Sequence, residues 1–290
     1  MLIKDVFSMY EEEEIIAGGL SKKTLESYVY AEKLASDYFS ATSNIEDIQP
    51  IDVRSFYQHL LTWQKPDTAR GNIVCFRSVV RLCVRKKMEM ATQPEDIKVP
   101  KREKRTIVYL TPTEVEEFFD VIAMKRRGYA EINRLRNIAI VKLLYCSGLR
   151  VGELCCLNRN SIRNRQFSVV GKSKEPRLCF INEETEKAIE DYLKARTDKN
   201  PALFISNENE KRITPGTIRR VFANACERSE FEGVHPHTLR HSFATTMLDR
   251  DVDLIYIGQL LGHESLDTTK MYTHYANPKL KRIYDMAMCR

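Results

Sequence analysis

The chain has 290 residues, enough for two ordinary domains or one large one. Its 43% hydrophobic content is typical of a water-soluble globular protein, and no apolar run is long enough to span a bilayer. The first residues, MLIKDVFSMYEEEE, turn acidic where a secretory signal would stay apolar, so we expect a cytoplasmic protein without a membrane partner.

The charge is unevenly distributed around a net value of +6. Residues 1–64 carry 5 basic and 11 acidic side chains, a balance of −6, whereas residues 65–105 carry 12 basic and 5 acidic, a balance of +7. A basic block beside an acidic one indicates a polyanionic partner on one face. On charge alone, a solvated helix face followed by a charged linker explains the pattern equally well.

Eight cysteines are present, and none forms a C-x-x-C pair. Most have apolar neighbours, which favours buried thiols in a reducing compartment over disulfides or a zinc site. They are Cys75, Cys83, Cys146, Cys155, Cys156, Cys179, Cys226 and Cys289.

The first hundred residues have apolar side chains at helical spacing. This spacing predicts helices over 20–38, 50–63 and 67–88, the first of them capped by Ser21. The predicted apolar sides are Leu25, Tyr28, Val29, Ala31, Leu34, Ala35 and Tyr38; Val53, Phe56, Tyr57, Leu60 and Leu61; and Ile73, Phe76, Val80 and Val84.

The third predicted helix also carries basic residues three to four positions apart, so several of them share a face suited to phosphates. They are Arg70, Arg77, Arg81, Arg85, Lys86 and Lys87. The helical pattern then ends in QPEDIKVPKREKR, which has two prolines, a basic cluster and no apolar period. We therefore predict a helical domain over 1–92 and a basic linker over 93–109.

A second domain is predicted over 110–276. Thr111 and Pro112 begin a helix, Gly148 ends an apolar one, and Val151 begins the next. Short β-like runs flank the turn GKSKEP between Phe167 and Ile181, and helices follow. The predicted fold is mainly α with one small antiparallel β-sheet.

Two candidate groups for chemistry lie in the first half of this domain. Arg150 follows a glycine turn, and Glu153, three residues on, shares its helix face and could orient it; a surface ion pair is the plainer interpretation. The run Gly171-Lys172-Ser173 lacks the glycine that a phosphate-binding loop needs five positions earlier, since Gln166 stands there. It leaves a lysine at a hairpin tip, which is either a surface residue or part of a neighbouring site.

Two more groups lie further along. In HPHTLRH, His237 and Arg240 project together from a helix start; no nearby carboxylate or cysteine completes a zinc site, so no metal is expected. His263 follows a glycine that ends a helix, and Tyr272 stands nine residues later. A tyrosine in such a place is by default a packing residue.

The order of these residues carries more information than any one of them. The segments SGLRVGELCCL, HPHTLRHSFATTML and LLGHESLDTTKMYTH closely match the motifs of the tyrosine recombinases, also called the integrase family, and the sequence resembles the short Xer-type members most. The resemblance runs in order through residues 111–275. It implies a helical core-binding domain over 1–92 and a mostly α catalytic domain over 110–276 with a small antiparallel sheet. The catalytic set would be Arg150, Lys172, His237, Arg240, His263 and Tyr272.

The resemblance also implies a mechanism. Tyr272 would attack a phosphodiester, Arg150 and Arg240 would stabilise the phosphoryl oxygens, and Lys172 would protonate the leaving 5′-oxygen. His237 would take the phenol proton, His263 would donate a hydrogen bond, and Glu153 would hold an arginine or a histidine in place. No metal is expected, because the two arginines would supply the electrostatic stabilisation that a metal gives in many phosphoryl-transfer enzymes. No cofactor such as ATP is expected either, because the covalent adduct stores the bond energy.

The expected partner is double-stranded DNA with a specific recombination site. The family works as a homo-tetramer on two synapsed duplexes, in some cases with a related partner recombinase. The expected DNA contacts are Arg70, Arg77, Arg81, Arg85, Lys101 and Arg102. The tail 277–290 is predicted to dock on a neighbouring subunit or to pack on its own domain. Dimer resolution, the integration or excision of a mobile element, and an inversion switch are all compatible with the sequence.

Two alternatives share these residues. A type IB topoisomerase uses the same chemistry without synapsis or a specific site, although the LGH and YTH motifs and the small size favour a recombinase. A non-catalytic DNA-binding protein of the same fold would have no use for Tyr272.

Overall fold

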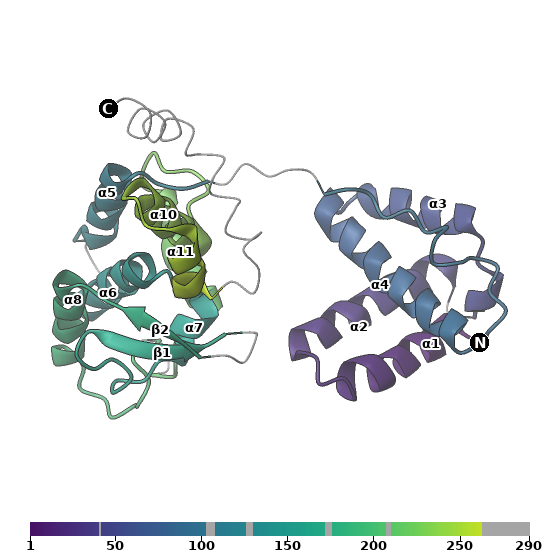
Figure 1. The fold of residues 1–290 in the computed structure, drawn as a ribbon, viewed down its shortest axis with the longest axis horizontal. Coiled ribbons are helices and arrows are strands. Elements are labelled where there is room, and N and C mark those ends of the chain that lie inside the picture. The colour runs from purple at the N-terminus through teal and green to yellow at the C-terminus, as the bar shows by residue number, and fades with distance from the viewer. Residues whose placement is uncertain (41, 103–107, 126–129, 172–175, 207–209, 263–290) are drawn as a thin grey trace, which may run out of the picture. The chain divides into compact units, whose positions relative to one another are not determined.

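A computed structural model of the protein describes residues 1–40, 42–102, 108–125, 130–171, 176–206 and 210–262. The chain divides into two compact units, Met1–Arg105 and Thr106–Arg290, and each is described by itself (Figure 1). Three residues of the predicted catalytic set, Lys172, His263 and Tyr272, lie outside the described residues, as does the tail 277–290.

The first unit is built of helices joined by loops, with no β-strand among its described residues. Its hydrophobic core contains several aromatic rings in contact; the ring centroids of Phe56 and Phe76, for example, lie 6.4 Å apart. The three predicted helices are confirmed, and a further helix at the N-terminus buries Ile3, Val6 and Phe7. The elements are α1 (Ile3–Tyr10), a π-helical turn η1 (Glu11–Ile16), α2 (Lys22–Phe39), a 3-10 turn η2 (Ile45–Asp47), α3 (Pro50–Leu61) and α4 (Pro66–Arg85).

Two residues predicted on the apolar side of α2 are exposed instead. The helix fully buries only Ala31 and Ala35, where α1 and α4 pack against it. Val29 is 47% exposed because it lies about 160° around the helix from Ala31. Tyr38 is 36% exposed, since its ring covers the edges of Phe56 and His59 rather than entering the core.

The predicted linker over 93–109 begins on the surface of the first unit. Ile97 is only 4% exposed and belongs to the hydrophobic core of that unit. The Nε of Arg70 donates a hydrogen bond of 2.8 Å to the carbonyl oxygen of Pro100, so the chain follows α4 to this point. One buried isoleucine in a polar segment gives no period, which is why the sequence pattern missed this packing.

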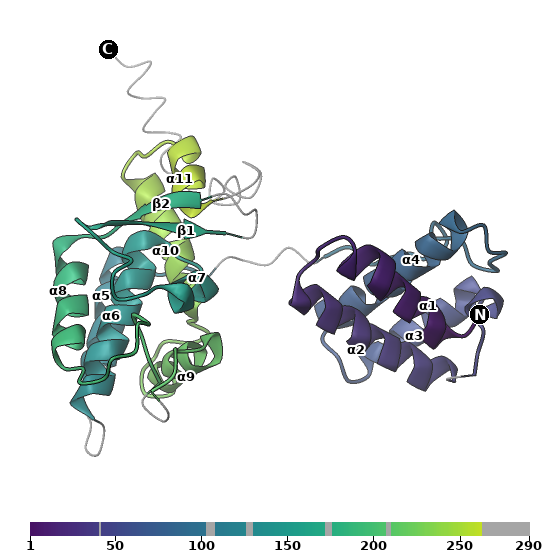
Figure 2. The same cartoon turned by 90° about the horizontal axis from the view of Figure 1, so that it is seen from below.

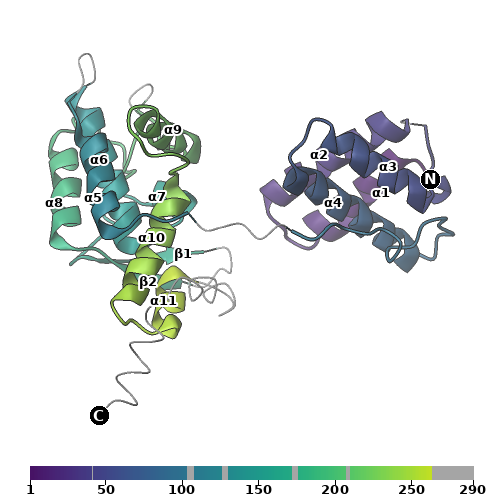
Figure 3. The same ribbon diagram turned by 90° about the horizontal axis from the view of Figure 1, so that it is seen from above.

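The second unit is built around α6, which packs against α5, α8 and α10. Its strands pair antiparallel, with Gln166 opposite Phe180 and Val170 opposite Pro176. Figure 2 shows β2 beside α11, and Figure 3 shows α9 beside α7. The predicted class, mainly α with a small antiparallel sheet, is confirmed. The elements are α5 (Pro112–Ala123), α6 (Glu131–Ser147), α7 (Val151–Cys156), β1 (Gln166–Val170), β2 (Pro176–Phe180), α8 (Glu183–Lys194), α9 (Pro215–Cys226), α10 (Pro236–Asp249) and α11 (Leu254–Leu261).

Local sequence sets the ends of the helices that bear the site. Thr111 and Glu114 form a reciprocal capping box at the start of α5. Gly148 ends α6 and Gly262 ends α11, both in the left-handed conformation, with φ of 60° and 62°. These boundaries confirm the predicted helix starts and stops.

The described cysteines are all free thiols, but they are less uniformly buried than predicted. Cys83, Cys155 and Cys179 are buried, three are half-buried, and Cys156 is exposed because it points outward from the short helix α7. No helix among the described residues has the length and apolar content that a membrane crossing requires.

Candidate active site

Arg150 stands between two helices. It follows the left-handed turn at Gly148 and, in extended conformation, precedes α7. Its backbone N–H donates to Oε2 of Glu153 at 2.8 Å, and its Nη1 donates to Oε1 of the same carboxylate at 3.0 Å. The side chain of Arg150 stays about one-third exposed at 36%, so one carboxylate orients the guanidinium while leaving it accessible.

Arg177 on β2 is a member of this cluster that the sequence reasoning missed. Its Nη1 and Nη2 donate to the two carboxylate oxygens of Glu153 at 2.8 and 2.6 Å, and both side chains are only 8% exposed. The Nε of Arg177 donates to the carbonyl oxygen of Leu260 at 3.0 Å. Strand alternation could have revealed it, because Arg177 shares the inward side of β2 with the buried Cys179.

Glu153 is ionised despite its burial. Burial acts to raise the pKa of its carboxyl group, but the hydrogen bonds and charge of Arg177, together with those from Arg150, lower that pKa below its usual value. The carboxylate therefore remains a fixed anion between two arginines at neutral pH.

Arg240, on the first turns of α10, is 4% exposed. Its Nη1 donates to the carbonyl oxygen of Gly148 at 2.6 Å, and its Nη2 donates to that of Leu261 at 2.7 Å. Arg150 donates from Nη2 to the carbonyl oxygen of Gly262 at 3.3 Å. Two arginines thus join three segments that lie far apart in the sequence, through main-chain oxygens at two helix ends.

Three glycines border this cluster closely. A Cβ at Gly148 would lie 2.7 Å from Phe243 and 2.9 Å from Leu261, and one at Gly262 would lie 2.8 Å from Cδ of Arg177. At Gly171, which precedes Lys172 in the sequence, a Cβ would lie 3.6 Å from Nη1 of Arg150. The end of β1 therefore reaches the Arg150 side of the cluster.

His237 lies on the first turn of α10 and is accessible to solvent. Crowding by protein atoms, and then the charges of Arg240, His235 and Arg150, lower the pKa of His237 below its usual value. The imidazole is therefore neutral at pH 7 and has a nitrogen able to accept a proton. Among the described residues, no group of histidine, cysteine and carboxylate side chains is arranged to hold a metal ion.

The basic face predicted on α4 is present, but its members differ in what they contact. Arg81 is exposed, Arg77 is half-buried, and Arg70 bonds to Pro100. Arg85 forms an ion pair of 2.6 Å with Glu14, and Lys86 forms one of 2.7 Å with Glu13, so the acidic turn η1 covers this end of α4. Lys101 and Arg102 are exposed.

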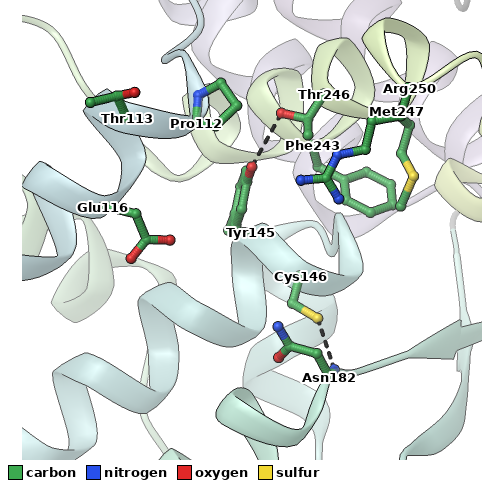
Figure 4. A pocket seen from close by; sticks show the side chains of 10 residues that line it. All are labelled: Pro112, Thr113, Glu116, Tyr145, Cys146, Asn182, Phe243, Thr246, Met247 and Arg250. Carbon is green, nitrogen blue, oxygen red and sulfur yellow. Dashed lines mark hydrogen bonds between the residues drawn. The ribbon is translucent and has the colours of Figure 1, made fainter.

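A cavity of about 640 Å³ lies elsewhere on the second unit, between α5, α6 and α10 (Figure 4). Within it the hydroxyls of Tyr145 and Thr246 lie 3.1 Å apart, and Sγ of Cys146 accepts a bond of 3.2 Å from the backbone of Asn182. Arg150, His237 and Arg240, the described members of the predicted catalytic set, do not line this cavity.

Comparison with protein families and curated proteins gives a consistent result. The model of the phage integrase family matches residues 108–278. The tyrosine recombinase XerC of Pelobacter propionicus is 33% identical over 263 residues, covering 86% of this chain and 81% of that protein. The tyrosine recombinase XerA of Pyrococcus furiosus is 36% identical over 200 residues, covering 67% of each chain.

Solved structures share the fold at low sequence identity. A Tn1549 transposon integrase in complex with circular intermediate DNA has a TM-score of 0.78 at 17% identity and covers 94% of this chain and 95% of its own. The XerH site-specific recombinase bound to palindromic difH substrate has a TM-score of 0.72 at 21% identity, covering 96% and 84%. A lambda integrase dimer bound to a core site has a TM-score of 0.74 at 18% identity, covering 94% and 77%.

Proposed function

This chain belongs to the phage integrase family and is a tyrosine recombinase, and we propose that it cuts and rejoins double-stranded DNA at a specific site through a covalent bond to Tyr272. The observation that carries the proposal is that Arg150 and Arg240 both donate to main-chain oxygens at the end of α11, while Arg240 also donates to Gly148 at the end of α6, two residues before Arg150. Gly262, whose carbonyl Arg150 contacts, directly precedes His263 in the sequence.

In the proposed cleavage step the Tyr272 hydroxyl oxygen attacks the scissile phosphorus. The bond from phosphorus to the 5′-oxygen breaks, leaving a 3′-phosphotyrosyl bond and a free 5′-hydroxyl. Attack adds negative charge to the phosphoryl oxygens, and Arg150 and Arg240 stabilise it, with a further hydrogen bond from His263.

Two protons must move during this step. An unperturbed phenol has a pKa near ~10, so Tyr272 needs a base, and the lowered pKa of His237 leaves its imidazole free to accept that proton. Lys172 protonates the leaving 5′-oxygen. Religation is the reverse attack by a 5′-hydroxyl, and it needs no ATP because the phosphotyrosyl bond retains the energy of the broken phosphodiester.

Recombination exchanges strands between two duplexes, so we place the enzyme in a homo-tetramer on synapsed sites, alone or with a related partner recombinase. The XerH and lambda integrase structures contain bound DNA, in accord with a DNA partner here. Arg70, Arg77, Arg81, Arg85, Lys101 and Arg102 are the proposed backbone contacts, which position DNA without reading its sequence. Dimer resolution, mobile-element integration or excision, and an inversion switch are the biological roles that fit.

The test uses a nicked suicide DNA substrate that carries the recombination site. Wild-type protein should form an adduct that survives denaturation, and Tyr272→Phe should form none. Tyr256→Phe is the matched control, because Tyr256 is a 61% exposed tyrosine on α11 and should leave adduct formation unchanged. A wild-type protein that yields no adduct on any recombination site would exclude the enzyme and leave a DNA-binding protein.

A relaxation assay separates the recombinase from a type IB topoisomerase. Supercoiled plasmid without a target site should stay supercoiled. Rapid relaxation of such a plasmid would contradict site-specific recombination and support the topoisomerase.

A further inference from the structure

One buried serine links the beginning of the second unit to α10. Ser242 is 0% exposed, and its hydroxyl oxygen accepts a hydrogen bond of 2.8 Å from the backbone N–H of Leu110, which lies 132 residues earlier. The same hydroxyl donates to the carbonyl oxygen of Thr238, one turn earlier in α10, at 2.9 Å. Leu110 is 6% exposed and is the first buried residue described after the linker.

The hydrogen bonds continue from Thr238 to the N-terminal end of α10. The Thr238 hydroxyl accepts from the backbone of His235 at 3.2 Å, and the Thr238 backbone donates to Nδ1 of His235 at 3.2 Å. His237 and Arg240 lie on these same first two turns. A displacement of Ser242 would therefore reach both proposed catalytic side chains of α10.

The chain on the other side of the bond is equally constrained. Thr111, next to Leu110, donates from its backbone to Glu114 at 2.7 Å, and Glu114 donates from its backbone to the Thr111 hydroxyl at 3.3 Å. Leu110 thus sits between the linker and the capping box of α5. A buried N–H must keep a hydrogen-bond partner, so the position of Leu110 depends on the position of Ser242 on α10.

We infer that Ser242 is a positioning residue, which aligns His237 and Arg240 with the point where the linker enters the second unit. The effect on the reaction rests on the proposed function, whereas the bond itself does not.

The first test measures adduct formation by Ser242→Ala at saturating suicide substrate. Since misplacement by about 1 Å can cost up to about 100-fold in rate, we expect a fall of at least about tenfold, with DNA affinity within about twofold of wild type. Ser242→Thr restores a hydroxyl and should recover most of the rate. Ser242→Cys, which keeps the volume with a weaker hydrogen-bonding group, should fall between alanine and wild type.

Ser229→Ala is the matched control. Ser229 makes the same pair of bonds, donating to the carbonyl oxygen of Ala225 at 2.9 Å and accepting from the backbone of Phe231 at 3.4 Å, but both partners lie within four residues of it, at the end of α9. Its adduct rate should match wild type. Equal rates for the Ser242 and Ser229 alanine variants, or a Ser242→Ala defect that appears as lost DNA affinity with an unchanged rate, would overturn the inference.

Amide hydrogen exchange of the full-length protein provides a readout independent of catalysis. Exchange at Leu110 should rise at least about tenfold in Ser242→Ala and stay unchanged in Ser229→Ala, because only the first variant releases that N–H. Unchanged exchange at Leu110 in Ser242→Ala would disprove the link even if the enzyme is a recombinase. Raised exchange together with no adduct from wild type would instead count against the proposed function alone.

Discussion

Glu153 serves two arginines, and its charge holds both in place. Glu153→Gln keeps the shape but leaves Arg177, 8% exposed, without an anion. Removing one partner from a buried ion pair costs about 3 kcal/mol or more, so the free energy of unfolding should fall by about that amount and adduct formation should slow. Urea denaturation followed by circular dichroism measures the first effect, and the suicide substrate measures the second.

Glu131→Gln is the control for that variant. Glu131 also pairs with an arginine three residues away, Arg134, but it lies on the surface. Its replacement should leave both measurements unchanged. A Glu153→Gln protein as stable as Glu131→Gln would show that the arginines keep their positions without the carboxylate.

His241 makes stability depend on pH in a defined window. Burial, and then the charges of His237, His235 and Arg240, lower the pKa of His241 to about 4, against about 6.5 for an unfolded histidine. The unfolded chain therefore binds the proton first, so the stabilisation is fully present above pH ~6.5 and is lost as the pH falls toward 4. Over that window His241 accounts for a loss of about 3 kcal/mol.

The measurement is urea denaturation of wild type and His241→Asn between pH 4.5 and 7. The wild-type free energy of unfolding should decline through this range, and the variant should decline less. His237, whose pKa is also lowered, adds to the same window and remains in the variant. Glu153 contributes only below this range, because its pKa is lowered from 4.5. Parallel curves for the two proteins would contradict the assignment.

The basic face of α4 should contribute to the salt dependence of DNA binding. Arg81 is exposed on the same face as Arg70 and Arg77, so Arg81→Gln should weaken binding equally on specific and random DNA. The slope of log K against log salt should become shallower by about 0.9, the value for one phosphate contact. Fluorescence anisotropy at several salt concentrations measures it.

Two other arginine variants serve as comparisons for the salt dependence measured with Arg81→Gln. Arg54→Gln removes an exposed charge from another helix, α3, and should leave the slope unchanged. Arg85→Gln should have a smaller effect than Arg81→Gln, because Glu14 already pairs with Arg85. A larger effect from Arg54 than from Arg81 would place the DNA on another surface.

The elements also show what local sequence can and cannot reveal. The start of α5, the end of α6 and the β-hairpin were predictable because caps, glycines and alternating strands leave local signatures. The helix α1 was missed because its eight residues make little more than two turns before the acidic run Glu11–Glu14 begins. The packing of Ile97 was missed because a single buried side chain has no period.

For the whole molecule, the sequence predicted the family and the residue types of the site but not how they are held. Motif order predicted Arg150, Arg240 and Glu153 as site residues, and an orienting contact from Glu153 to Arg150 was one of the arrangements considered, which the structure contains. The bonds from arginines to main-chain oxygens could not be predicted, since every residue carries a carbonyl. The same holds for the link from Leu110 to Ser242, whose partners are 132 residues apart.

The contacts of Arg240 with main-chain oxygens determine which substitutions the turn at Gly148 can tolerate during evolution. Because Arg240 contacts carbonyl oxygens, the polarity of the side chains at 148 and 261 does not enter the hydrogen bond. Size does enter at position 148, where Phe243 and Leu261 leave no room for a Cβ. The volume of the side chain at position 148, and not its polarity, therefore decides whether a substitution is tolerated. Related chains should keep a small residue at this turn, whatever DNA sequence each of them recognises.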